Sequence, residues 1–167
     1  GRIKRNAGAR PGDRLVLGKP IGVGVLSAAL KKGRLAPGGY DAMIASTTRL
    51  NTPGQALSGL DGVHALTDVT GFGLLGHTLE LCRGARLAAR LSMGAIPLLP
   101  GVRELAETGI VTGASGRNWA AYGDAVEMLA GLDTTERAML TDPQTSGGLL
   151  VACAADAVDE VLDVFRR

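Results

Sequence analysis

A glycine-rich turn in the middle of the sequence brings together residue types that can bind a phosphate and a cation. In residues 67–77, the Asp68 carboxylate and the Thr70 hydroxyl lie among several glycines, between a predicted strand and a predicted helix. Glycine lets a ligand approach the backbone closely, and the free amides at a helix start attract anions. Magnesium is commonly held by one or two carboxylates together with substrate phosphates, and it would remove the repulsion between such an anion and Asp68. A site for magnesium and a nucleotide phosphate is therefore one interpretation of this turn.

The same turn has two other interpretations. Asp68 or Thr70 can cap the following helix through its side-chain oxygen, which on spacing alone is the more common role of such a residue. The glycines also satisfy the GxGxxG pattern of a Rossmann dinucleotide site. That site expects an acidic residue roughly 20 positions later, where this chain has Leu91-Ser92-Met93-Gly94. The missing acidic residue weighs against a Rossmann oxidoreductase.

A second cluster of polar and small residues occupies positions 142–148, with the sequence Asp-Pro-Gln-Thr-Ser-Gly-Gly. Its Asp, Thr and Ser side chains can bind the backbone or a ligand, and its glycines leave room for a close approach. From composition alone, an ordinary loop between a helix and a strand is slightly favoured. Ser146 does not fit the GxSxG motif of a serine hydrolase, and no pattern places His64 or His77 as its base. Neither histidine is assigned a catalytic role.

The elements that position these turns follow from periodicity and from glycine and proline signals. Strands are expected at 14–17, 63–67, 87–93 and 149–153. Helices are expected in a short piece after Pro53-Gly54 and at 25–32, 40–50, 74–82, 102–108, 123–129, 134–140 and 155–167. The stretch 109–120 is glycine-rich, and its pattern is too weak to assign. Both candidate turns thus lie next to predicted strands.

The length and composition fit one domain with an aliphatic core. The 167 residues are 46% hydrophobic and 3% aromatic, and they include 25 glycines. The net charge of +2 is spread along the chain and few aromatic residues can stack on bases, so no nucleic-acid partner is expected. No apolar run reaches membrane-spanning length, so no membrane partner is expected. Cys82 and Cys153 lack CxxC spacing, and together with the absence of a secretory leader pattern they indicate a cytoplasmic protein.

Six strings of the sequence, taken in order, resemble selenophosphate synthetases (selenide, water dikinases), which belong to the aminoimidazole ribonucleotide synthetase superfamily. They are residues 6–13, 19–26, 67–77, 96–101, 116–118 and 142–150. The strings Thr-Asp-Val-Thr-Gly-Phe-Gly and Asp-Pro-Gln-Thr-Ser-Gly-Gly are distinctive of that family. The match extends over essentially the whole chain, which is identified as a carboxy-terminal domain of this family. Gly18 departs from the family pattern, which commonly has Thr before Lys-Pro.

The resemblance implies an α+β fold of the type found at the carboxy-terminal end of aminoimidazole ribonucleotide synthetase, with helices packed on a mixed β-sheet. Residues 1–13 would be a linker from a missing amino-terminal domain, and residues 14–167 the carboxy-terminal domain, truncated at its end. The complete enzyme would be a homodimer that converts ATP, selenide and water to selenophosphate, AMP and phosphate. The isolated chain is expected to be inactive, because the family's reactive Cys or selenocysteine, a nearby Lys and further metal-binding aspartates lie in the missing half.

For the site, the resemblance implies that Asp68 binds Mg²⁺, which overturns the preference for capping. The nucleotide would be contacted by residues of both turns, namely Thr70, Gly71, Gly73, Thr145, Ser146 and Gly147. Two alternatives stay open with less support: a domain of this fold that only binds a nucleotide or a partner, and a Rossmann-type oxidoreductase.

Overall fold

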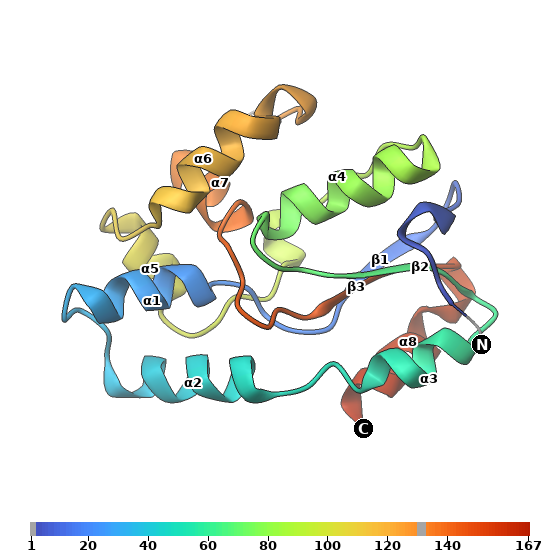
Figure 1. Ribbon diagram of the computed structural model, residues 1–167, viewed down its shortest axis with the longest axis horizontal. Helices are drawn as coiled ribbons and strands as arrows, with labels where there is room; N and C mark the ends of the chain where they lie inside the picture. The colour runs from blue at the N-terminus through green and yellow to red at the C-terminus, as the bar shows by residue number, and fades with distance from the viewer. Residues whose placement is uncertain (1–2, 130–132) are drawn as a thin grey trace.

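A three-stranded antiparallel sheet forms the centre of the computed structural model, which describes residues 3–129 and 133–167 (Figure 1). The strands are β1 (Arg14–Leu17), β2 (Val63–Asp68) and β3 (Leu149–Cys153), in the order β1-β3-β2. In the register of the sheet, Leu150 lies opposite Leu17 on one side and opposite Thr67 on the other. All five residues of β3 are buried, as expected for a short, continuous apolar run.

Helices cover both faces of this sheet. α4 (Gly73–Ala85) lies over one face, and α3 (Pro53–Gly59) and α8 (Val158–Arg166) lie over the other (Figure 1). Alternate residues of β3 point to opposite faces, so Leu150 packs in the cluster beneath α4 and Val151 packs in the cluster beneath α8. α8 contributes apolar side chains at helical spacing, namely Val158, Val161, Leu162 and Phe165.

Five more helices in the described residues lie toward the left of Figure 1, on the side where β2 leads into α4, with α2 beneath α1. They are α1 (Val23–Lys31), α2 (Pro37–Thr48), α5 (Val102–Glu107), α6 (Gly113–Tyr122) and α7 (Thr134–Leu140). α1 packs against α2 and α5, and α7 contacts α4, α5 and α6. These helices surround the two turns that carry the candidate site residues.

The α+β class is confirmed. The strands expected at 14–17 and 149–153 have the predicted bounds, and the strand expected at 63–67 extends to Asp68. The three strands pair only in antiparallel fashion. The resemblance implied a mixed sheet. In the described residues, the only parallel pairing is one isolated bridge between Ile21 and Leu98, outside the sheet.

The strand predicted at 87–93 is wrong. Residues 87–92 have irregular backbone and are mostly exposed, and Met93–Ala95 form a 3-10 helix. None of the described strands pairs with this segment, and a strand without a partner leaves its backbone groups unsatisfied except by water. The partial alternation of apolar residues was therefore an insufficient signal.

The chain around α6 also differs from the prediction. The predicted helix at 123–129 is a 3-10 helix at Gly123–Ala125 followed by irregular backbone. Gly123 packs so closely on the Trp119 ring that a Cβ there would lie 2.7 Å from a ring carbon. The helix instead precedes this point, as α6, and begins after Thr112, whose side chain accepts a hydrogen bond from the Ser115 amide.

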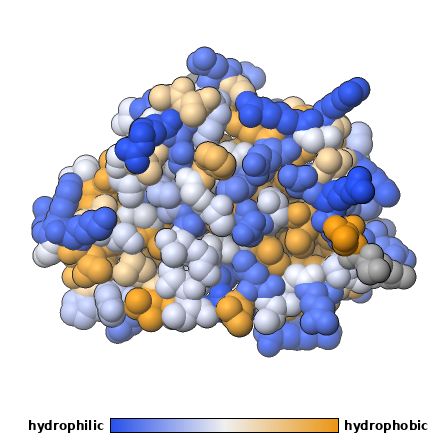
Figure 2. Space-filling view, in the orientation of Figure 1, coloured by the Kyte–Doolittle hydropathy of each residue, from blue (hydrophilic) through white to orange (hydrophobic). Residues whose placement is uncertain are grey.

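The segment before β1 packs against the sheet and α4. Ala7 lies against Gly84 of α4, and the Asp13 carboxylate is 2.8 Å from Nδ1 of His64 on β2. The boundary between a linker and a domain at residue 13 stays a prediction. Figure 2 shows hydrophilic and apolar residues intermixed on the face of Figure 1. None of the helices in the described ranges has the length and apolar composition to cross a membrane.

Candidate phosphate and cation site

The two candidate turns lie side by side, held together by backbone hydrogen bonds. The Val69 amide donates to the carbonyl of Gly148 at 2.9 Å, and the Gln144 amide donates to the carbonyl of Thr70 at 3.0 Å. Gly147 packs against the Val69 carbonyl so closely that any Cβ would overlap it. The turn after β2 and the loop before β3 therefore form one structural unit.

The carbonyl groups of Thr70, Gly71 and Phe72 in the turn after β2 all accept hydrogen bonds. Thr70 accepts from two backbone amides, those of Gly73 and Gln144. The side chain of Asn118 on α6 donates to the Gly71 carbonyl at 2.9 Å, and the hydroxyl of Tyr122 donates to the Phe72 carbonyl. Because its carbonyls are held by other elements, the turn is fixed before any ligand arrives.

The amides of the same turn are free. Within the described part of the chain, the backbone N–H groups of Thr70, Gly71 and Phe72 donate to no protein acceptor. Gly71 is exposed, and the Phe72 side chain is 56% exposed. Gly73 starts α4 with φ at 72°, where a Cβ would also lie 2.6 Å from the carbonyl carbon of Thr141. The turn thus offers free amides at the start of a helix, which is an arrangement that favours anions.

Asp68 ends β2 beside these amides and is exposed. Among residues 3–129 and 133–167, its carboxylate has neither a hydrogen bond nor an ion pair, so it is available to a ligand. The capping alternative is wrong, because the N-cap of α4 is Phe72 and no side chain caps it. One free carboxylate next to free amides fits a cation that also binds a phosphate.

The described residues do not supply a complete donor set for a cation. No group of three or more His, Cys, Asp or Glu side chains in the described ranges could hold a metal ion. Asp68 therefore supplies one carboxylate, and the remaining ligands would have to be phosphate oxygens, water or groups from another polypeptide segment.

The loop before β3 contributes two exposed hydroxyl residues, Thr145 and Ser146. Ser146 has φ at 50°, in the left-handed region that is uncommon for residues other than glycine. Its carbonyl accepts a hydrogen bond from the Lys19 ammonium at 2.6 Å. Gly147, in contrast, is buried and packs on the first turn, so its role is to bring the two turns together.

Lys19 is a buried cation that holds this loop. Its side chain is 5% exposed, and Nζ also donates to the carbonyls of Ser46 and Arg49 at 3.2 and 2.6 Å. Burial, and to a smaller degree the charge of Arg49, lowers the pKa of Lys19. Lys19 therefore has a structural role, because it ties the loop before β3 to residues 46 and 49.

Asp142 and Gln144 bind the start of α1. Asp142 Oδ2 accepts from the amides of Gly24 and Val25 at 2.9 and 3.2 Å, and Gln144 Oε1 accepts from the amides of Gly22 and Val23. Asp142 is fully buried, and its Oδ1 has no hydrogen-bond partner in the structure. Burial raises the pKa of Asp142 to about 7, although the hydrogen bonds from Val25, Gln144 and Gly24 lower it.

One series of side-chain hydrogen bonds was not predicted from the sequence. Thr70 Oγ1 is 3.1 Å from Nε2 of His77, and Nδ1 of His77 is 2.8 Å from Oε2 of Glu80. No role is predicted for His77 from the sequence. The spacing of His77 and Glu80, three residues apart on a predicted helix, was the available signal, since such residues are neighbours on a helix surface.

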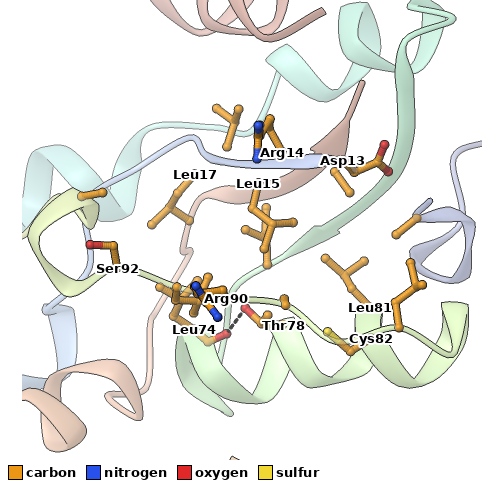
Figure 3. Close-up of a pocket in the computed structure, with 18 of the residues that line it drawn as sticks. Asp13, Arg14, Leu15, Leu17, Leu74, Thr78, Leu81, Cys82, Arg90 and Ser92 are labelled. Atoms are coloured by element: carbon orange, nitrogen blue, oxygen red, sulfur yellow. Dashed lines mark hydrogen bonds between the residues drawn. The ribbon is translucent and has the colours of Figure 1, made fainter. Parts of the chain in front are cut away.

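A cavity of about 1050 Å³ lies elsewhere, between the free edge of β1, α4 and residues 87–97 (Figure 3). Leu15 and Leu17 of β1 face Leu74 and Thr78 of α4 across it (Figure 3). None of the predicted site residues lines this cavity. The candidate site is therefore the open surface at the two turns. The antiparallel sheet also excludes the Rossmann alternative, because that fold needs parallel strands joined by crossover helices.

Solved structures share this fold at low sequence identity. Escherichia coli HypE superposes with a TM-score of 0.67 at 22% identity, covering 98% of this chain and 42% of that one. A structure titled as hydrogenase maturation protein HypE in complex with ATP superposes with a TM-score of 0.64 at 19% identity, covering 98% and 41%. At these identities the likeness concerns the fold.

Curated relatives are much closer in sequence. Selenide, water dikinase of Paraburkholderia xenovorans is 68% identical over 165 residues, which are 99% of this chain and 47% of the relative. The protein of the same name in Burkholderia pseudomallei is 69% identical over the same shares. The chain spans about half the length of the curated relatives it matches.

A family match covers nearly the whole chain. Residues 10–167 match the family described as AIR synthase related protein, C-terminal domain. This range includes both candidate turns, the three strands and all the helices that surround the site. The fold and the match agree, and the chain belongs to the family of AIR synthase related proteins, as its C-terminal domain.

Proposed function

We propose that this chain is the carboxy-terminal domain of a selenide, water dikinase, which makes selenophosphate, AMP and phosphate from selenide, ATP and water. The observation that carries the proposal is the 68% identity over 99% of the chain to a relative of that name. The two joined turns add a physical reason, because they offer a free carboxylate beside free amides, as a domain that helps to bind a metal–nucleotide complex requires.

In this proposal, each turn has a separate task in phosphate binding. Asp68 would hold Mg²⁺, and the amides of Thr70, Gly71 and Phe72 would receive phosphate oxygens. The hydroxyls of Thr145 and Ser146, which are exposed on the adjoining loop, would donate to the same phosphate chain. Gly73 and Gly147 act by their lack of a Cβ, since they let the helix start and the loop pack closely.

Bound magnesium would neutralise charge on the phosphate oxygens, which is the main requirement of phosphoryl transfer. The protein residues would position the nucleotide phosphates. The turn is fixed by Asn118, Tyr122 and Gln144, so little reorganisation is needed when the nucleotide binds.

The remaining partners follow from the same proposal. The full-length enzyme would bind ATP, in line with the ATP complex of the HypE neighbour, and it would take selenide at groups of the missing amino-terminal domain. It would be a cytoplasmic homodimer without a nucleic-acid or membrane partner. A domain that only binds a nucleotide or a partner is the competing function, and activity separates the two.

The test is selenide-dependent formation of AMP and phosphate by the full-length protein. We expect product only when ATP, selenide and magnesium are all present. A full-length protein that binds Mg-ATP but forms no AMP with selenide would support the binding-only domain and overturn the proposal.

A further inference from the structure

We propose that His77 and Glu80 are positioning residues for the Thr70 hydroxyl. They make this hydroxyl donate its proton to His77, so that the free lone pairs of Thr70 Oγ1 face a cation or a cation-bound water. This inference rests on the proposed function, because it concerns the site at which magnesium and nucleotide would bind. It gives Thr70 a role distinct from that of Thr145 and Ser146, whose hydroxyls are free to donate to phosphate.

The three side chains form a continuous chain that ends at the first turn. Glu80 Oε2 is 2.8 Å from His77 Nδ1, and His77 Nε2 is 3.1 Å from Thr70 Oγ1. His77 is 6% exposed and also packs against the Phe72 ring, with 5.9 Å between the ring centroids. The Glu80 side chain is 43% exposed, and Thr70 lies two residues after Asp68. This series of hydrogen bonds thus links α4 to the turn that carries the free Asp68 carboxylate.

The chemistry of the three groups fixes the direction of each hydrogen bond. An ionised carboxylate only accepts, so Nδ1 of His77 carries the proton that is donated to Glu80. In a neutral imidazole the other nitrogen then accepts, so the Thr70 hydroxyl donates to Nε2. The remaining lone pairs of Thr70 Oγ1 can only accept. A hydroxyl in this state suits a cation or its bound water and repels a phosphate oxygen.

The arrangement matches the way a carboxylate orients a histidine that serves a metal site. Here the imidazole acts one group further away, through the hydroxyl. His64 is a suitable control for His77, because its Nδ1 also lies 2.8 Å from a carboxylate oxygen, Asp13 Oδ1. In the described part of the chain, no side-chain hydroxyl is bound to Nε2 of His64. His64 therefore has the carboxylate but no group to position.

Nitrogen-15 NMR of this chain tests the direction directly, because the sequence contains only two histidines. At a pH where both imidazoles are neutral, we expect His77 to be protonated at Nδ1 and not at Nε2. Glu80→Leu should move the proton toward Nε2 of His77, and Glu80→Gln, which keeps an acceptor, should move it less. The His64 signals should not change. Protonation of wild-type His77 at Nε2 would overturn the inference, whatever the enzyme does.

A magnesium titration of selenide-dependent AMP formation by the full-length protein tests the consequence. His77→Phe removes the acceptor for the Thr70 hydroxyl and should raise the half-saturating magnesium concentration about fivefold, the size of one hydrogen bond. The KM for ATP at saturating magnesium should change less than twofold. Glu80→Leu keeps the imidazole and should act in the same direction, and His64→Gln should leave the titration unchanged. If both site variants keep the wild-type magnesium titration, His77 only packs and the inference fails.

A double variant shows whether His77 acts through Thr70. Thr70→Val should raise the half-saturating magnesium concentration at least as much as His77→Phe does. The double variant should show no further increase. Additive effects would mean that His77 acts by another route and would overturn the inference. Absence of activity in the wild-type full-length protein would count against the proposed function alone, because the NMR experiment would still decide the direction of the hydrogen bonds.

Discussion

Asp68 and Asp142 carry the same carboxylate in different surroundings. Asp68 is exposed at the end of β2, and in the described residues nothing binds its side chain. Asp142 is fully buried and binds the first amides of α1 through one oxygen. Asp68 is free to bind a ligand and Asp142 holds the fold together, although both lie in strings that contain several polar residues.

Replacing Asp68 by Asn should affect metal use and leave the fold intact. Because the side chain is exposed and unpaired, we expect the free energy of unfolding to change by less than about 0.5 kcal/mol. In the full-length enzyme, the loss of the negative charge should lower selenide-dependent AMP formation by more than about tenfold at limiting magnesium. The control is Asp41→Asn, at an exposed position on α2. Wild-type activity in the Asp68 variant would remove this residue from the site.

Asp142 should make stability depend on pH. Its pKa is raised from 3.8 to about 7 in the folded chain, so the folded state binds this proton more tightly than the unfolded state. Its contribution to stability is therefore fully present below pH 3.8 and is lost as the pH rises through about 7. Asp142 can change the free energy of unfolding by at most about 1.4 kcal/mol per pH unit.

Urea unfolding of this chain at several pH values measures this effect. Asp142→Asn cannot ionise, so its stability relative to wild type should increase as the pH rises from 3.8 to about 7. Asp41→Asn should show the wild-type pH dependence. Parallel curves for wild type and the Asp142 variant would contradict the expectation.

At the scale of elements, close packing between the turns makes individual glycines unequal. Gly147 lies against the Val69 carbonyl, so the turn after β2 and the loop before β3 have no room for a side chain between them. Gly116, within α6, has no heavy atom within 4 Å of a potential Cβ. The same substitution should therefore have opposite effects at these two positions.

Gly147→Ala should destabilise the chain by about 2 kcal/mol or more, because backbone must move to relieve the overlap. Gly116→Ala should stabilise it by roughly 0.5–1 kcal/mol, since alanine is a better helix former than glycine. Thermal unfolding followed by circular dichroism measures both. A neutral Gly147→Ala would mean that the two turns are not packed as described.

The sequence predicted those elements whose signals are local. The strands at 14–17 and 149–153 were recognised because short apolar runs are bounded by turn residues. α6 was missed because its glycines weaken the helical pattern, although Thr112 gives an N-cap signal. The strand expected at 87–93 depended on a partner, and pairing is decided by distant residues.

The candidate site shows the same division. Asp68 and the glycines beside it were found from their types and order. The hydrogen bond between Gln144 and Thr70 joins positions 74 residues apart, and no local pattern indicates it. No role was predicted for His77, because only its bond to Glu80, three residues away on the same helix, has a local signal, whereas its bond to Thr70 depends on the folded turn.

At the scale of the whole molecule, the described residues hold one free carboxylate at the site and no metal-binding cluster. The rest of a phosphoryl-transfer site would have to come from the amino-terminal half of the proposed enzyme. The chain covers 47% of the curated relative from Paraburkholderia xenovorans, which leaves room for such a half. Activity is therefore expected of the assembled enzyme.

We accordingly expect the isolated 167-residue chain to form no AMP from ATP with selenide and magnesium. The full-length protein, assayed at the same concentration, is the control. Circular dichroism should show that the inactive chain is folded, so that inactivity is not a failure to fold. Selenide-dependent turnover by the isolated chain would show that one domain suffices and would contradict the division of the site between two halves.

The central position of β3 has a consequence for the way the protein is made. β1 and β2 both precede β3 in the sequence, but within the described residues each of them pairs only with β3 (Leu149–Cys153). During synthesis, both outer strands therefore lack this partner until β3 has left the ribosome. Pairing between strands that are far apart in sequence is slow, and unpaired strands tend to associate with other chains. Pairing with β3 therefore completes the sheet and also closes the inner edges of β1 and β2 to other chains.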